Sequence, residues 1–248
     1  MEKDESPPLV KLLHTLKKRL VFCVIATGVG FIICYTFSET LFRVLARPLK
    51  VELAPESSFI YTGLPEMFFN YIKIGFVGGL LLAAPFILYQ IWMLAAPALN
   101  ERQKRLVLPF VVCSSLLFIG GGLFGYLVAF PFGFKFFLGF ESEYLQALPS
   151  VKQYLSFSIK LLFLFGLVFE FPVLAFFLTK AGVVTPEFLK KNRAYAMFLI
   201  FVLAAVLTPP DVISQIMLAI PLLLLYEVGI LVSRMVGGGK KSGVNEEE

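Results

Sequence analysis

Charged residues are scarce in this 248-residue chain. Asp, Glu, Lys and Arg make up 16% of it and hydrophobic residues 58%, whereas about a quarter of an ordinary soluble domain is charged. The mean hydropathy is +0.84, and a single soluble core of this size cannot bury so much apolar surface. The composition therefore excludes an ordinary soluble enzyme, a disordered chain and a disulfide scaffold, and it indicates a protein whose solvent is mostly lipid.

The residues that usually carry chemistry are also few. The chain has one histidine, one tryptophan and three cysteines. Cys23, Cys34 and Cys113 lie in apolar stretches without the spacing of metal ligands, which is typical of small buried hydrophobes. No P-loop, dinucleotide-binding or zinc-protease motif occurs. We therefore expect no catalytic residue, no metal and no cofactor.

Six apolar segments predict an all-α integral membrane protein. A helix needs about 20 apolar residues to cross a bilayer, and the fifth segment is shorter than that. Residues 1–236 are expected to form a single six-span domain, and the glycine-rich, charged residues 237–248 a flexible cytoplasmic tail. The predicted spans cover approximately residues 20–37, 68–95, 106–130, 153–180, 194–207 and 214–236.

The distribution of Lys and Arg predicts that both termini are cytoplasmic. The N-terminal segment, the second-to-third and fourth-to-fifth connections and the tail are rich in basic residues, and the connections that alternate with them are poorer. The basic residues behind the net charge of +5 are therefore interpreted as topogenic, and we expect no nucleic-acid partner. Two sizeable outer connections, 38–66 and 131–152, follow from this orientation.

Proline is frequent in or at the ends of the predicted spans. Each proline inside a helix removes a backbone donor and tends to bend it. Several bent spans favour a curved, concave wall over a straight bundle. The glycines at 120–122 and at 125 either soften the third span or allow close packing. The prolines concerned are Pro85, Pro109, Pro131, Pro172 and Pro221.

Glu170 is the clearest polar residue within an apolar segment, near the middle of the fourth span. A carboxylate at that depth costs a few kcal/mol on insertion scales, so it must face protein, water or a partner. Two interpretations are open: a polar site facing a wet cavity, or an interhelical hydrogen bond that only stabilises the bundle. A proton-coupled secondary transporter of small solutes, with Glu170 as its ion site, and a membrane scaffold are the alternative functions.

Several strings together resemble the TatC family, the six-span subunit of the twin-arginine protein translocase. The resemblance covers residues 9–236 in the family's order. The strings are VLTPPDVISQ at 206–215, APFILYQIW at 84–92, FGLVFEFP at 165–172, FGYLVAFP at 124–131 and TPEFLKKNR at 185–193.

The resemblance implies a function that rests on binding and assembly. Such a protein binds twin-arginine signal peptides at the cytoplasmic face. It recruits small single-span subunits of the TatA and TatB type and works beside other copies of itself. Folded proteins then cross the lipid bilayer by means of the proton-motive force. The implied location is the bacterial cytoplasmic (inner) membrane, which the chain crosses several times.

The resemblance also implies where a pair of guanidinium groups would bind. Such a site favours carboxylates, yet Thr15 and Gln103 occupy the two positions where the family has them. Glu101, two residues before Gln103, either supplies the missing charge or is a solvated loop charge near Arg105. Thr15, Glu101, Gln103 and Arg105 are therefore the expected signal-peptide residues.

Other positions match the family more closely. Glu170 matches its intramembrane acid, and Thr208 and Gln215 match polar positions where the small partners dock. Asp211 matches a family position too, and its place before the last helix is equally explained by an N-cap role. Residues 41–45, ahead of Pro48, fit a short interfacial helix. The remaining matches are Pro48, Pro85 and Tyr126.

Overall fold

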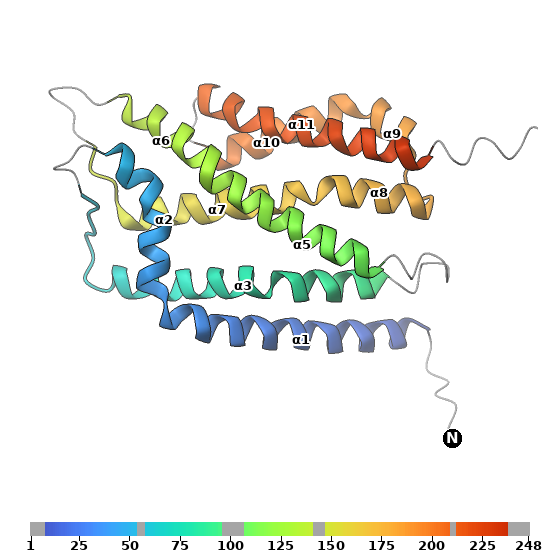
Figure 1. Ribbon diagram of the computed structural model, residues 1–248, viewed down its shortest axis with the longest axis horizontal. Coiled ribbons are helices and arrows are strands. Elements are labelled where there is room, and N and C mark those ends of the chain that lie inside the picture. Colours follow the sequence, from blue (N-terminus) through green and yellow to red (C-terminus); the bar gives the residue numbers. More distant parts are fainter. Residues whose placement is uncertain (1–7, 54–57, 96–106, 141–146, 209–211, 238–248) are drawn as a thin grey trace, which may run out of the picture. The chain divides into compact units, whose positions relative to one another are not determined.

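The computed structural model describes residues 8–53, 58–95, 107–140, 147–208 and 212–237 (Figure 1). These residues are almost entirely helical. Within them no β-strand occurs, and a single isolated bridge pairs Ile60 with Ser150. The prediction of an all-α fold is confirmed.

The chain forms two compact units. The first comprises residues 1–44 and 63–115, and the second comprises residues 45–62 and 116–248. The first unit contains α1 (Pro8–Thr36) and α3 (Glu66–Ala95), and α2 (Ser38–Glu52) and α5 (Val107–Phe124) contribute to both units. The second unit also contains η2 (Gly125–Ala129), α6 (Phe130–Leu138), α7 (Val151–Phe169), α8 (Phe171–Ala181), α9 (Pro186–Lys191), α10 (Arg193–Leu207) and α11 (Val212–Gly237).

The described helices define a multi-pass membrane protein. Five helical stretches are long and apolar enough to cross a bilayer. α10 is apolar but has only 15 residues, in line with the expected shortness of the fifth span. That α10 crosses the bilayer, that the spans form a single domain and that they build a concave wall remain predictions. The five long stretches are Leu13–Thr36, Glu66–Leu94, Leu108–Leu138, Val151–Ala181 and Val212–Gly237.

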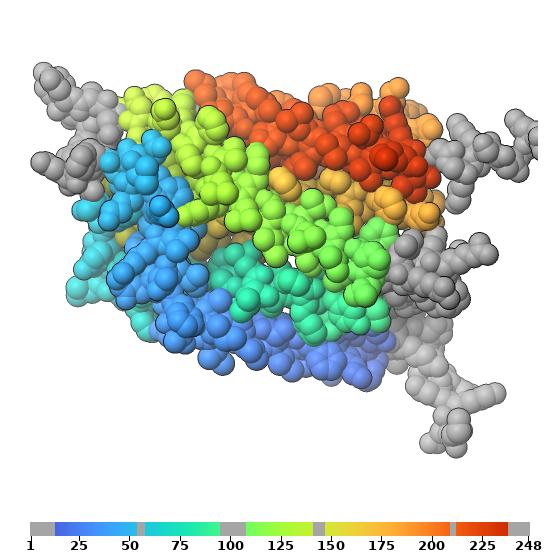
Figure 2. Space-filling model, in the orientation of Figure 1, coloured from blue at the N-terminus to red at the C-terminus, as the bar shows by residue number. Residues whose placement is uncertain are grey.

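α1 and α3 lie side by side in the first unit (Figures 1 and 2). Glycines allow their backbones to come into contact. A Cβ atom on Gly30 would lie 2.5 Å from the carbonyl oxygen of Gly79, and one on Gly75 would lie 3.0 Å from the Cα of Tyr35. The residue numbers rise on one helix as they fall on the other, so the two helices are antiparallel. Small residues at such crossings supply packing where the hydrophobic effect between helices is absent.

Close packing in the second unit also depends on glycine. A Cβ atom on Gly121 of α5 would collide with the carbonyl oxygen of Phe165 on α7. Gly166 of α7 faces the ring of Phe118 in the same way, 2.9 Å from its Cε2. Among the glycines of the third span, Gly121 and Gly125 therefore provide close packing, whereas an added Cβ on Gly120 or Gly122 would meet nothing within 4 Å.

The third span is longer in the structure than predicted. Helical structure continues beyond residue 130 to Leu138, because Pro131 stands in the first turn of α6, where its missing N–H is not needed. A π-helical segment, Gly125–Ala129, precedes it, and the N–H of Phe130 donates to the carbonyl oxygen of Gly125. This wider turn joins α5 to α6 without ending the helix.

The helix predicted ahead of Pro48 is present but longer. α2 runs from Ser38 to Glu52 with Pro48 inside it. Ala46 and Leu49 are buried, and the hydroxyl of Tyr154 donates to the carbonyl oxygen of Leu45 at 2.6 Å. In the second unit, α2 is thus held against α7.

The expectation that the cysteines are buried within the protein is wrong. Cys23 and Cys34 are half-buried and Cys113 is exposed, and all three are free thiols. In a membrane span an apolar side chain needs no protein cover, because lipid tails are as apolar as a protein core. The apolar setting of these cysteines in the sequence therefore indicates a span without indicating which face of the helix they occupy.

Candidate functional site

The predicted signal-peptide residues divide into one described and three undescribed positions. Thr15 lies on α1 and is exposed. Glu101, Gln103 and Arg105 lie outside the described residues, as does Asp211. The helices on either side of residues 96–106 are α3 and α5.

A hydrogen bond joins α1 to α3 one turn from Thr15. Nη1 of Arg19 donates to Oε1 of Gln90 at 2.9 Å. Gln90 is 9% exposed. Because the bond lies on the same side of α1 as the glycine crossing, it extends the α1–α3 interface towards the N-terminal end of α1.

The two contacts fix the register of the antiparallel pair. Arg19 and Gly30 are eleven residues apart on α1, and Gly79 and Gln90 are eleven residues apart on α3. Eleven residues are about three helical turns, so both helices present the same faces at both contacts. One further turn of this register brings Thr15 level with Leu94, next to where residues 96–106 begin.

A second polar contact joins α3 to α5. Nε1 of Trp92 donates to Oγ of Ser114 at 3.1 Å, and both residues are buried. The indole also stacks on the ring of Phe110, with a centroid distance of 5.4 Å. Within its last six residues α3 therefore contacts α1 through Gln90 and α5 through Trp92.

Sequence reasoning missed these four side chains. In the sequence, Arg19 is one of the basic residues that predict topology, Gln90 and Trp92 fall in the string APFILYQIW at the end of the second span, and Ser114 lies in the third span. The available signal was polarity itself, because a donor or acceptor within a membrane helix needs a partner.

Glu170 lies between two helices in the second unit. α7 ends at Phe169 and α8 begins at Phe171, with Pro172 in its first turn. The N–H of Glu170 donates to the carbonyl oxygen of Leu167 at 3.2 Å. Its side chain is only 5% exposed. The expected break beside Pro172 is present, and it carries the buried carboxylate.

Thr208 and Gln215 lie at the junction between α10 and α11. The hydroxyl of Thr208, the C-cap of α10, donates to the carbonyl oxygen of Ala204 at 2.9 Å. Nε2 of Gln215 donates across the hairpin to the carbonyl oxygen of Phe201 at 3.0 Å. The structure thus gives each of these two predicted residues a hydrogen bond to the backbone of α10.

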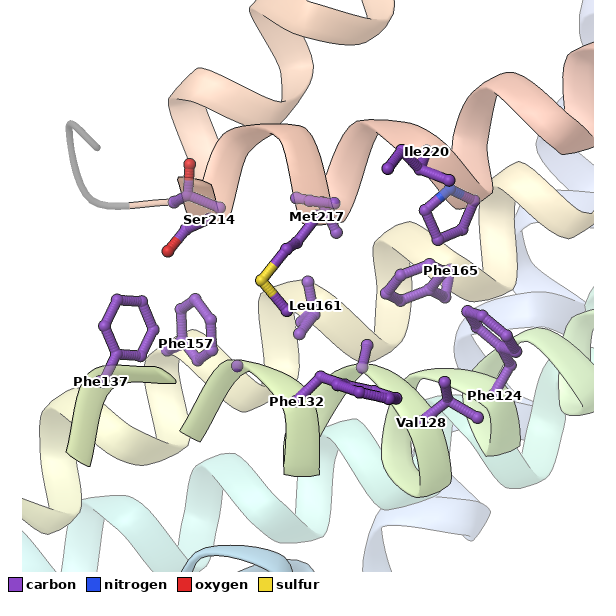
Figure 3. A pocket seen from close by; sticks show the side chains of 15 residues that line it. Phe124, Val128, Phe132, Phe137, Phe157, Leu161, Phe165, Ser214, Met217 and Ile220 are labelled. Carbon is purple, nitrogen blue, oxygen red and sulfur yellow. The ribbon is translucent and has the colours of Figure 1, made fainter. Parts of the chain in front are cut away.

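An apolar cavity of about 270 Å³ opens beside this junction (Figure 3). Residues of α5, η2, α6, α7 and α11 line it together with Thr208 at the end of α10, and most of them are aromatic or aliphatic. Thr208 and Ser214 are the hydroxyl-bearing residues among those that line it. In Figure 3, Met217 of α11 points towards Leu161 of α7 across the cavity.

The other predicted family positions, Pro48, Pro85 and Tyr126, lie within helical segments. Pro48 lies inside α2 and Pro85 inside α3. Tyr126 lies in the π-helical segment η2, and its ring packs edge-on against Phe130 with a centroid distance of 6.0 Å. The register of α3 on α1 is the same on both sides of Pro85, so this proline does not shift the helix pair.

The fold and these polar helix ends define a multi-pass α-helical membrane protein. Residues 11–221 match the family model described as Sec-independent protein translocase protein (TatC). The relative from Desulforapulum autotrophicum is 48% identical over 99% of this chain and 90% of its own length, and that from Escherichia coli K12 is 41% identical over 100% and 95%. Both are named Sec-independent protein translocase protein TatC.

A solved structure agrees with these relatives. The crystal structure of a twin arginine translocase receptor, TatC, is 40% identical to this chain, covers 91% of it and 99% of its own chain, and superposes with a TM-score of 0.82. The chain belongs to the TatC family. It is the core multi-pass subunit of a Sec-independent protein translocase.

Proposed function

We propose that this subunit binds twin-arginine signal peptides at its cytoplasmic face and recruits small single-span subunits of the TatA and TatB type. Folded cargo then crosses the bacterial inner membrane by means of the proton-motive force. The likeness to a solved relative that is a twin-arginine translocase receptor supports this proposal. The subunit acts by binding and assembly, alongside other copies of itself, and performs no covalent chemistry.

The observation that carries the proposal is the register of α1 on α3. Thr15 is level with Leu94, so an exposed acceptor on α1 lies level with the end of α3, after which residues 96–106 follow in the sequence. That segment contains Glu101, Gln103 and Arg105. Hydroxyl, amide and carboxylate oxygens from two chain segments would then surround a pair of guanidinium groups, which bind best to several fixed acceptors.

The orientation follows from this site. Both termini, Thr15 and residues 96–106 are proposed to face the cytoplasm, where signal peptides are made. The basic residues of the N-terminal segment, the second-to-third connection and the tail support it. A cysteine at position 64, for which Leu64 is 97% exposed, should react with an impermeant maleimide added outside intact cells, whereas one at position 15 should not.

The charge of Glu101 provides the direct test of recognition. Because charge-assisted hydrogen bonds are worth about 1.5–3 kcal/mol, Glu101→Gln should weaken binding of a twin-arginine peptide about tenfold or more in lipid nanodiscs. The matched control is Glu39→Gln, which removes an exposed carboxylate that pairs with Arg43 within α2. Equal affinity for the wild type and Glu101→Gln would assign Glu101 to the solvated loop.

The α10–α11 junction is the proposed docking site for a small single-span partner. Thr208 and Ser214 border an apolar cavity at this junction, and Gln215 ties α11 to α10. An apolar surface with a few polar groups suits a transmembrane helix that carries one polar residue. Gln215→Leu should reduce co-purification of the partner, whereas Gln153→Leu, an exposed glutamine in α7, should not.

A further inference from the structure

Arg19 and Gln90 form a side-chain link next to the proposed recognition site without belonging to it. Thr15 and Arg19 are four residues apart on α1, which places both on nearly the same face. Arg19 reaches across to α3, and Thr15 remains exposed. Gln90 is buried and lies four residues before Leu94.

The link is not needed to hold the membrane bundle together. The backbone contacts of Gly30 with Gly79, three turns deeper, already pack α1 on α3. Around Thr15 the side chains of Leu13, Leu16 and Leu20 are 61%, 44% and 62% exposed. Contacts of these three side chains with α3 therefore do little to fix this end of α1, and the Arg19–Gln90 hydrogen bond supplies a polar contact there.

We propose that the Arg19–Gln90 hydrogen bond is a positioning contact for signal-peptide recognition. It holds the turn of α1 that carries Thr15 against the end of α3 and so fixes the position of Thr15 relative to Leu94. This inference rests on the proposed function. With Thr15 and Gln103 as neutral acceptors, recognition depends on geometry more than it would with two carboxylates, because neutral hydrogen bonds are weaker.

The same positioning role explains why the acceptor of Arg19 is the neutral amide of Gln90 and not a carboxylate. A carboxylate at position 90 would attract the arginines of the signal peptide to the flank of the site. A guanidinium without an acceptor would swing over Thr15 and repel them. Gln90 binds the guanidinium and adds no charge of its own.

The test compares variants that break and rebuild the hydrogen bond. Gln90→Leu removes the acceptor, and Gln90→Asn draws it back by one methylene as a milder change. The double variant R19Q/Q90R exchanges donor and acceptor between the helices. Arg43→Gln, which breaks an exposed pair within α2, serves as the control. Affinity for a synthetic twin-arginine peptide is measured in nanodiscs, with thermal stability measured alongside.

We expect Gln90→Leu to weaken peptide binding roughly tenfold, the effect of losing one hydrogen bond to a charged group, with little change in melting temperature. R19Q/Q90R should restore most of that loss, and R19Q alone should not. Unchanged affinity in Gln90→Leu and Gln90→Asn would overturn the proposal, as would tighter binding in R19Q alone, which would indicate simple charge repulsion.

A second measurement separates this inference from the proposed function. Cysteines replace Thr15 and Leu94 in a background with Cys23, Cys34 and Cys113 changed to alanine, and the rate of disulfide formation is followed. Gln90→Leu should slow it several-fold. If the wild type fails to bind the twin-arginine peptide, the proposed function is wrong, yet slowed cross-linking still supports the positioning contact. An unchanged rate contradicts the contact whatever the peptide does.

Discussion

Gly30 and Gly79 meet where α1 crosses α3, and a Cβ atom on Gly30 would lie 2.5 Å from the carbonyl oxygen of Gly79. The two backbones are therefore in direct contact. This crossing sets the register on which the position of Thr15 depends. A side chain at either glycine would separate the helices or shift one along the other.

Gly30→Ala should destabilise the protein by about 1–3 kcal/mol, the usual cost of overpacking a close contact. The control is Gly28→Ala, two residues away on the same helix, where an added Cβ meets nothing within 4 Å. Alanine favours helix over glycine by up to about 1 kcal/mol, so Gly28→Ala should be neutral or stabilising. Reversible unfolding in mixed micelles measures both; equal effects would show that the crossing is looser than described.

Trp92 and Ser114 should be energetically coupled. Trp92→Phe keeps an aromatic ring beside Phe110 but removes the donor to the Ser114 hydroxyl, which is fully buried. Polar pairs between membrane helices are worth about 0.6–2 kcal/mol. A double-mutant cycle with Ser114→Ala should show a coupling energy in that range. Additive losses of unfolding free energy would mean that the hydrogen bond contributes nothing.

The buried hydroxyl pair of Thr179 and Ser233 should stabilise the contact between α8 and α11. Their oxygens lie 2.6 Å apart, and the Thr179 hydroxyl also bonds the carbonyl oxygen of Ala175. Ser233→Ala should cost about 1 kcal/mol of unfolding free energy. Ser115→Ala, which removes a hydroxyl bonded only within its own helix turn, should cost less. The reverse order would contradict the pairing.

Much of the fold follows from the sequence because apolar length is a local property. The runs that contain Gly30, Gly79 and Phe165 are recognisable as spans from composition alone, and the weak fifth span corresponds to the short helix α10. The helix break beside Glu170 follows from Pro172. The sequence predicted that the third span ends at residue 130, just before Pro131. In the structure a π-helical segment joins α5 to α6, and the helix continues past Pro131.

The pairing of polar side chains could not be read in the same way. Gly28 and Gly30 look alike in the sequence, yet only Gly30 faces another backbone. Likewise Arg19 and Gln90 are 71 residues apart, and nothing local relates them. Such contacts depend on the register of two helices, which is set by distant packing.

Glu170 should tolerate an amide better than a methyl group. Glu170→Gln keeps an oxygen acceptor at the α7–α8 break, and Glu170→Ala removes every polar atom from a buried position. Export of a twin-arginine cargo should therefore fall strongly in Glu170→Ala and much less in Glu170→Gln. Leu167→Ala, in the preceding turn and 67% exposed, is the control. Full export in Glu170→Ala would reduce Glu170 to a structural role.

The end of the first unit that carries Thr15 is the proposed receptor for the signal peptide, and photo-crosslinking from positions 15 and 103 to a twin-arginine peptide tests this most directly. A twin-lysine peptide serves as competitor, and position 64, at the other end of the unit, serves as control. We expect adducts at 15 and 103 that the twin-lysine peptide does not displace, and none at 64. No adduct at 15 or 103, from a protein that still exports the cargo, would contradict the proposed site.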